Sequence, residues 1–150
     1  MMFTTHIVFA LFSGLLFLNF FPIKEKWLFL VFVIASSFIP DIDHPRAKLG
    51  RKVKLVAFLF KHRGFFHSML FLALLEFLLL FSKSNLLFYS IILGISSHIL
   101  LDALTRKGIM PFYPLTKFRI RGYVETNALA EKIIFIILVI GILCLALGNV

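Results

Sequence analysis

Imidazole and carboxylate side chains recur in three short segments of this 150-residue sequence. Residues 40–44 read PDIDH, residues 62–68 read HRGFFHS, and residues 94–105 read GISSHILLDALT. In the last of these, His98 and Asp102 are four residues apart and would share one face of a helix. Because imidazole and carboxylate ligands suit zinc, manganese or iron, the three segments favour a metal site.

Each segment also has a structural interpretation. The acidic residues of PDIDH could cap a helix end in solvent, and His62 could be an exposed loop histidine. His67 could lie at a membrane surface with its ring tip in water, and His98 could form a private hydrogen bond with Asp102. The spacing of the residues leaves these alternatives open.

Three further residues could take part in chemistry. His6 lies in an apolar segment and could be either a satisfied interior histidine or a ligand. Glu76 lies nine residues after His67 and faces the opposite side of the predicted helix, which favours a helix–helix hydrogen bond or a protonated group. Cys144, the single cysteine, lies far along the last apolar segment and is not expected to bind metal.

The elements that must position these residues belong to a membrane protein. Hydrophobic residues make up 61% of the chain, against about 45–50% in soluble domains. Charged residues make up 15%, and the mean hydropathy is +1.01. A soluble domain of this length could not bury so much apolar surface, so we expect one integral membrane domain over residues 1–150.

Five apolar runs predict an all-α integral membrane bundle of about five transmembrane helices. The second run has only 13 residues, against the roughly 20 that span a bilayer, and it would need tilt or local thinning. A short interfacial helix is expected at residues 53–60, which cations flank. Residues 105–128 are predicted to be a loop with a short hairpin at 117–124. The five predicted runs are 3–21, 27–39, 65–81, 86–104 and 129–147.

The positive charges predict the orientation. With five spans, the N-terminus, residues 40–64 and residues 105–132 share one side, which holds all but Lys24, Lys26 and Lys83 of the 16 lysine and arginine residues. The positive-inside rule makes this side cytoplasmic. We therefore expect a multi-pass inner-membrane protein with a cytoplasmic N-terminus and an extracytoplasmic C-terminus. The net charge of +9 comes with no nucleic-acid-binding motif, so no nucleic-acid partner is expected.

The order of the three segments, followed by Gly-x-x-Pro at 108–111, resembles the family of LexA-regulated, membrane-bound, metal-dependent hydrolases. The resemblance covers roughly residues 1–115 and includes a histidine near the N-terminus. This chain has Phe66 where the family has threonine, which removes a hydroxyl near the site. The resemblance implies a ligand set of His6, Asp41, Asp43, His44, His62, His67, His98 and Asp102.

Together these features predict a hydrolase that uses a divalent metal, zinc or manganese. Eight ligands exceed the four that one zinc takes, so two ions would fit, as in many phosphoester hydrolases. Asp43 and Arg63 are the expected catalytic residues, and Arg63, Arg106 and Lys107 could hold a phosphate. The expected partner is a membrane lipid or lipid-linked substrate, cut at the cytoplasmic interface. The alternatives are a metal-ion transporter and a structural metal-binding membrane protein.

Overall fold

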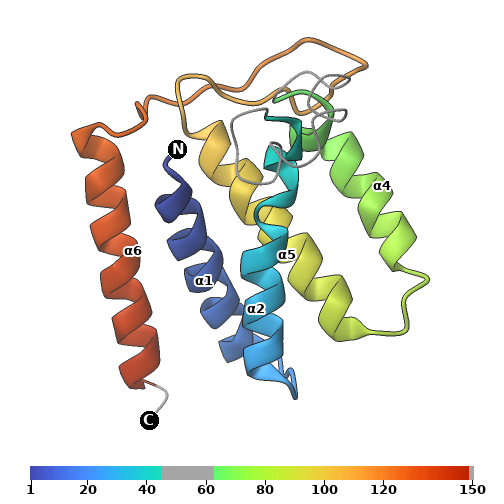
Figure 1. The fold of residues 1–150 in the computed structure, drawn as a ribbon, viewed down its shortest axis with the longest axis vertical. Helices are drawn as coiled ribbons and strands as arrows, with labels where there is room; N and C mark the ends of the chain where they lie inside the picture. The colour runs from blue at the N-terminus through green and yellow to red at the C-terminus, as the bar shows by residue number, and fades with distance from the viewer. Residues whose placement is uncertain (45–62, 149–150) are drawn as a thin grey trace.

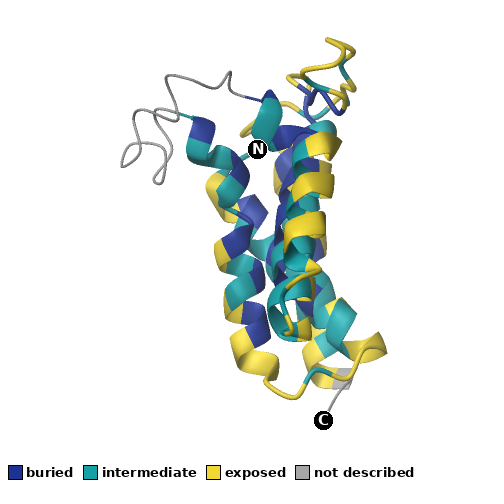
Figure 2. Ribbon diagram, turned by 90° about the vertical axis from the view of Figure 1, so that its right-hand side faces the viewer, coloured by how far each residue is buried: buried dark blue, intermediate teal, exposed yellow. Residues whose placement is uncertain are grey.

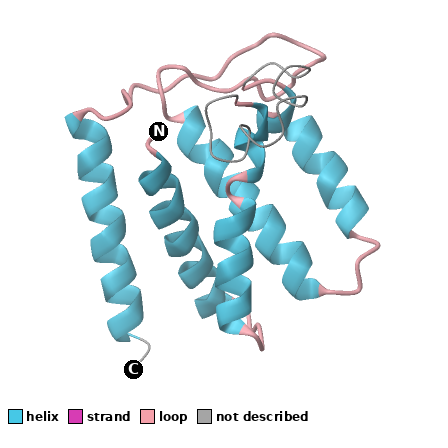
Figure 3. Ribbon diagram, in the orientation of Figure 1, coloured by secondary structure: helices cyan, strands magenta, loops and turns pink. Residues whose placement is uncertain are grey.

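The computed structural model describes residues 1–44 and 63–148 and consists of helices joined by loops (Figures 1 and 3). No named β-strand occurs in this part of the chain, so the all-α prediction is confirmed. The predicted interfacial helix at residues 53–60 lies outside the described residues. The helices are α1 (Phe3–Phe20), α2 (Lys26–Ser36), α4 (Met69–Leu79), α5 (Asn85–Ala103) and α6 (Leu129–Gly148), with two 3-10 turns, η1 (Ile39–Asp43) and η2 (Phe65–His67).

The helices run alternately up and down, and α5 lies at the centre of the bundle (Figure 1). α5 packs against α1, α2 and α4, whereas α6 packs mainly against α1. Figure 2 shows that exposed positions, mixed with half-buried ones, lie on the outer helix faces. On α6 these faces carry Ile136, Ile137, Ile140 and Leu143. Such apolar outer faces suit contact with lipid.

Three helices, α1, α5 and α6, are long and apolar enough to cross a membrane. α2 and α4 have 11 residues each, which at 1.5 Å per residue is about half of a 30 Å hydrocarbon core. The short second helix was predicted from the sequence. The prediction of one continuous helix over 65–81 is wrong. The chain forms η2 first, and α4 begins only at Met69.

Ser68 causes this break. Its backbone is extended, with φ −101° and ψ 153°, and its hydroxyl accepts a hydrogen bond from the Phe71 amide at 3.1 Å. The same hydroxyl donates to the Phe65 carbonyl at 2.7 Å. Ser68 therefore caps α4 and separates it from η2, which carries the buried His67.

Close contact between α2 and α5 sets the geometry of the bundle. A Cβ atom on Gly94 would lie 2.0 Å from Ser36 Oγ and 2.3 Å from the Val33 carbonyl oxygen, so only glycine fits there. Ser36 Oγ also donates to the Ser90 carbonyl at 3.1 Å. Small residues allow helices to approach closely in membranes. This contact brings η1, which follows α2, beside the C-terminal end of α5.

One alternative for Glu76 and the predicted hairpin fail at the periphery of the bundle, whereas a protonated Glu76 stays a prediction. Glu76 is exposed on α4 and makes no helix–helix hydrogen bond with the described residues. Residues 117–124 do not form a hairpin on themselves, because Ile120 and Val124 pair with Ile109 and Thr105. The segment returns to the end of α5, where a Cβ on Gly122 would lie 2.1 Å from the Leu104 carbonyl oxygen.

Candidate metal centre

Seven of the predicted site residues are linked by short contacts. The elements that carry them come together at the end of the bundle that holds the N-terminus (Figure 1). They come from four parts of the chain that are distant in sequence. Each part places its residues at this end because α1 begins here, η1 and η2 lie here, and α5 ends here. The seven residues are His6 on α1, Asp41 and Asp43 on η1, Arg63 and His67 at η2, and His98 and Asp102 on α5.

Two groups of three side chains have the geometry of metal ligands. His6, His98 and Asp102 each offer one ligand atom, and these atoms lie within 4.8 Å of one another. Asp41, His67 and His98 form a second group by the same measure. His98 belongs to both groups, so it lies at the centre of the cluster.

The distances within the cluster are those of close polar neighbours. His6 Nε2 lies 3.6 Å from Asp102 Oδ1, and His67 Nε2 lies 3.4 Å from Asp102 Oδ2. His98 Nε2 lies 3.7 Å from Asp41 Oδ1 and 3.8 Å from Asp102 Oδ2. The imidazole rings of His6 and His98 stack, with centroids 3.9 Å apart and 15° between their planes. Three imidazoles and two carboxylates thus surround one small volume.

His98 is buried, with 1% of its surface exposed, yet neither ring nitrogen has a hydrogen-bond partner among the described residues. Nδ1 of the buried His6 also has none in the same part of the chain. A buried polar group without a hydrogen bond is costly. Buried imidazole nitrogens that lack a hydrogen-bond partner among the described residues and lie next to carboxylates are suited to bind a metal ion.

Arg63 holds Asp102 in place. Its Nη2 donates to Asp102 Oδ1 at 2.8 Å, and its Nη1 donates to Thr105 Oγ1 at 2.8 Å and to the Gly108 carbonyl at 3.1 Å. The backbone of Arg63 has φ 59°, a conformation that non-glycine residues rarely adopt. The guanidinium is therefore engaged inside the protein, which favours a positioning role over direct contact with a phosphate.

Asp43 supports His67 from the opposite side. Asp43 is fully buried, and its Oδ2 accepts from the Arg63 amide at 3.2 Å and lies 3.5 Å from His67 Nδ1. A carboxylate on one nitrogen of a histidine orients the other nitrogen toward a metal. The other nitrogen of His67 faces Asp102.

The other described residues that the sequence predicted belong to neither group of three. His44 directly follows η1, is half-buried, and belongs to neither group of three. His62 lies outside the described residues. Cys144 is exposed on α6, away from the cluster, as expected. Arg106 is exposed and forms an ion pair with Glu125, and the side chain of Lys107 is exposed.

Two residues of this region were missed by the sequence analysis. Thr105 accepts from Arg63 and donates to the Asp102 carbonyl at 2.7 Å, and its position three residues after Asp102 could have identified it. Glu131 is fully buried in the first turn of α6. It accepts from the backbone amides of Met2 and Asn127, each at 2.6 Å. An acid inside the last apolar run was the available indication.

Glu131 should be a major anchor of α6 and of the first turn of α1. Glu131→Ala removes the acceptor from two backbone amides, so we expect it to lower the free energy of unfolding by about 1–3 kcal/mol for each amide left buried. Thermal unfolding in detergent measures the loss. Glu125→Ala is the matched control, because exposed ion pairs contribute little. Equal stability of the two variants would contradict the anchoring role.

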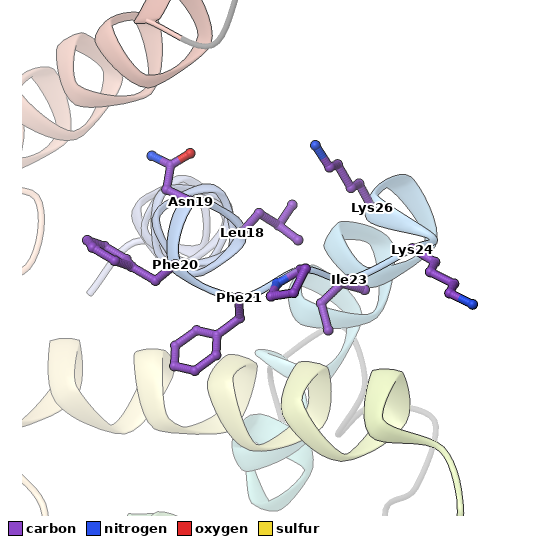
Figure 4. A pocket seen from close by; sticks show the side chains of 8 residues that line it. Leu18, Asn19, Phe20, Phe21, Ile23, Lys24 and Lys26 are labelled. Carbon is purple, nitrogen blue, oxygen red and sulfur yellow. The ribbon is translucent and has the colours of Figure 1, made fainter.

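A hollow of about 340 Å³ lies at the opposite end of the bundle, between the end of α1 and the start of α2. Figure 4 shows that Leu18, Phe21 and Ile23 are among the residues that line it. The side chains of Lys24 and Lys26 point apart there, so they do not converge on one anion. This hollow is separate from the histidine–aspartate cluster.

Comparison with known proteins finds a family profile that covers nearly the whole chain and relatives that match about two thirds of it. The sequence profile described as YdjM inner membrane protein matches residues 1–149. The uncharacterized protein YvsG of Bacillus subtilis is 33% identical over 105 residues, which are 66% of each chain. The inner membrane protein YdjM of Escherichia coli is 35% identical over 100 residues, which are 60% of this chain and 51% of the relative. No solved structure matches the chain significantly.

The chain thus spans about two thirds of the Bacillus relative and about half of the Escherichia coli relative. The names of these relatives confirm the membrane-bound part of the resemblance seen in the sequence. Regulation by LexA and hydrolysis of a substrate are not part of these names and stay predictions.

Proposed function

The chain belongs to the YdjM inner membrane protein family, and on that premise we propose that it is a membrane-bound, metal-dependent hydrolase of phosphoesters. The observation that carries this proposal is the environment of His98. This buried imidazole is shared by two groups of three ligands, and both of its nitrogens lack a hydrogen bond to the described residues. A histidine kept for packing or for hydrogen bonding would not need this environment.

Zinc and manganese are the metals that best fit these imidazole and carboxylate donors. When bound, a divalent metal supplies an activated water and stabilises negative charge on a phosphoryl group. His6, His98 and Asp102 would hold one ion, and Asp41 and His67 could hold a second. Asp102 would be the shared ligand, because its Oδ1 faces His6 and its Oδ2 faces His67, whereas a single nitrogen of His98 can bind only one ion. Two such sites sharing one ligand would suit the two-metal arrangement of many phosphoester hydrolases.

The protein's own residues would prepare this site in three ways. Arg63 fixes Asp102 through a charged hydrogen bond and thereby sets the direction of its second oxygen. Asp43 orients His67. Lys107, exposed beside the cluster, is available to bind an anionic group of the substrate. In this geometry Asp43 and Arg63, the two expected catalytic residues, act through the ligands that they position.

A membrane-resident substrate agrees with the place of the cluster. The ligands lie at the ends of α1 and α5, two helices that can span a membrane, rather than at mid-depth. A cleavable bond at headgroup depth would meet them there. A lipid or lipid-linked phosphoester is therefore the proposed substrate, with a carboxylic ester or amide as the alternative chemistry.

A metal-ion transporter is the second candidate that the sequence raised. Transporters place binding residues near the bilayer midplane, whereas the cluster here is confined to one end. Among the described acidic residues, Glu76 on α4 is exposed, and Glu131 lies at the same end as the cluster. This distribution favours chemistry at the interface.

The hydrolase proposal can be tested with purified protein in detergent. The protein is stripped with chelator, reloaded with zinc or manganese, and incubated with phospholipids, polyprenyl phosphates and their carboxyester analogues. We expect metal-dependent release of phosphate or of a phosphorylated headgroup, lost in Asp43→Ala and kept in the matched control Cys144→Ser. Cleavage of the esters alone would replace the phosphoester proposal, and a fully metallated protein that cuts none of them would contradict hydrolysis.

The proposed orientation places the cluster at the cytoplasmic face of the membrane. The topology predicted from the sequence puts all but Lys24, Lys26 and Lys83 of the 16 lysine and arginine residues on the same side of the membrane as the N-terminus. The positive-inside rule makes this side cytoplasmic. The N-terminus and the end of α6 lie at opposite ends of the bundle (Figure 1). A reporter enzyme active only outside the cytoplasm should therefore be active when fused after Val150. Activity of a cytoplasmic reporter at the same position would contradict this orientation.

A further inference from the structure

The segment between α5 and α6, residues 104–128, forms a strap across the end of the bundle that holds the cluster (Figure 1). It leaves the end of α5 and returns to the start of α6, and both helices are long and apolar enough to span a membrane. The strap must therefore run along one membrane face, beside the cluster.

The inner limb of the strap, residues 105–111, is packed into the protein. Ile109 and Ile120 exchange two backbone hydrogen bonds of 3.0 Å, and the Met69 amide donates to the Pro111 carbonyl at 2.7 Å. Met110 is buried, with 2% of its surface exposed. The Gly108 carbonyl accepts from Arg63. The inner limb is thus fixed to the cluster.

The outer limb of the strap, residues 112–123, has the opposite character. It exposes large apolar side chains although it is not part of a spanning helix, and Tyr123 is 94% exposed and Leu115 78% exposed. Exposed apolar groups gathered on one surface mark a place of interaction. The exposed apolar residues of the outer limb are Phe112, Leu115, Phe118, Ile120 and Tyr123.

Cations alternate with these apolar residues. Lys117, Arg119 and Arg121 lie in the outer limb, which contains no acidic residue. Arg119 donates to the Lys107 carbonyl at 2.7 Å, whereas Lys117 and Arg121 are exposed. Aromatic and aliphatic residues combined with cations are typical of segments that lie in the headgroup region of a membrane. Positive charge at this depth attracts anionic lipids.

We propose that the outer limb of the strap is a docking surface for anionic lipid headgroups, in the leaflet that faces the cluster. Lys117 and Arg121 contact the headgroup phosphates, and Leu115, Phe118 and Tyr123 enter the boundary of the acyl chains. The inner limb holds this surface against Arg63 and Thr105, so bound lipid is kept next to the cluster. The proposal concerns lipid binding and does not depend on hydrolysis.

Quenching of one indole tests the proposal. The single tryptophan, Trp27, lies at the start of α2 and is first removed by Trp27→Phe. Leu115→Trp is then added, so that the protein carries one indole, on the outer limb. The protein is reconstituted in phosphatidylcholine vesicles that contain phosphatidylglycerol. Two samples are compared, in which either phosphatidylglycerol or phosphatidylcholine carries a spin label in its headgroup region. The labelled lipid is present in both leaflets, so the comparison does not depend on the direction in which the protein inserts. We expect labelled phosphatidylglycerol to quench several-fold more strongly than labelled phosphatidylcholine.

Variants with altered charge test whether the strap causes the preference for phosphatidylglycerol. Lys117→Gln with Arg121→Gln should remove the difference between the two lipids, and high salt should reduce it. Lys24→Gln with Lys26→Gln, the same charge change at the opposite end of the bundle, should leave it unchanged. All four positions are exposed, so the fold should be kept.

Three results would overturn the proposal. These are equal quenching by the two lipids, an indole that neither label quenches, and a preference that persists in the Lys117 and Arg121 variant. None of these measurements uses hydrolytic activity, so failure of lipid docking and failure of the proposed hydrolase function are distinguishable.

Discussion

Replacing His98 by phenylalanine should abolish metal binding and at the same time stabilise the metal-free protein. His98 is buried with no hydrogen bond on either nitrogen among the described residues, and such a group costs roughly 1–3 kcal/mol. A phenyl ring is similar in shape and can keep the stacking on His6. We therefore expect His98→Phe to raise the free energy of unfolding of the stripped protein by about 1 kcal/mol.

Metal content and thermal unfolding of stripped and reloaded protein measure the two effects. Wild-type protein should gain stability on reloading with zinc or manganese, because an ion that binds only the folded state stabilises it. His98→Phe should show no such gain. A variant that is less stable than the stripped wild type would indicate that His98 serves the fold. Unchanged metal content would remove His98 from the ligands.

Asp102→Ala is expected to cause the largest loss of stability among the single substitutions at the cluster. Asp102 is buried, faces three histidines, and accepts the hydrogen bond of the Arg63 guanidinium at 2.8 Å. Removing one partner of a buried ion pair costs about 3–5 kcal/mol, because the other charge is left buried and uncompensated. Metal binding should also fall by more than the roughly 10–100-fold that loss of an outer-shell partner costs.

Asp41→Ala is the matched control for Asp102→Ala. Asp41 is also a carboxylate in a group of three ligands, but 29% of its side chain is exposed, and the basic side chain that it faces among the described residues is the imidazole of His98, at 3.7 Å. We expect reduced metal content with little change in thermal unfolding of the stripped protein. If Asp102→Ala and Asp41→Ala were equally stable, the proposed clamp between Arg63 and Asp102 would be contradicted.

The sequence by itself determined that this is a helical membrane protein and that its histidine and aspartate residues lie toward one membrane face. Hydrophobic content and the lengths of the apolar runs are local properties, and a bilayer accepts only segments that satisfy their backbone internally. The first, fourth and fifth runs therefore became α1, α5 and α6 within one residue of their expected ends. The pairing of His98 with Asp102 followed from helical periodicity alone.

Tertiary structure decided which of the eight candidate ligands meet. Asp41 approaches His98 because Gly94 allows α2 to pack closely on α5, and His67 does so because Ser68 ends the turn before α4. His6 approaches through the packing of α1 on α5. A lone glycine or serine in an apolar run does not indicate which helix it will contact.

Tertiary structure also decided the role of Arg63 and the place of Glu131. From the sequence, an arginine in a loop of a membrane protein is expected to be a surface charge. In the structure, the backbone of Arg63 has φ 59° and its guanidinium donates to Asp102 and Thr105 inside the protein. Glu131 lies in the last apolar run but binds the amide of Met2, 129 residues earlier in the chain. Contacts over such distances depend on how helices pack, and packing is a property of side-chain shapes in three dimensions that hydropathy and periodicity do not record.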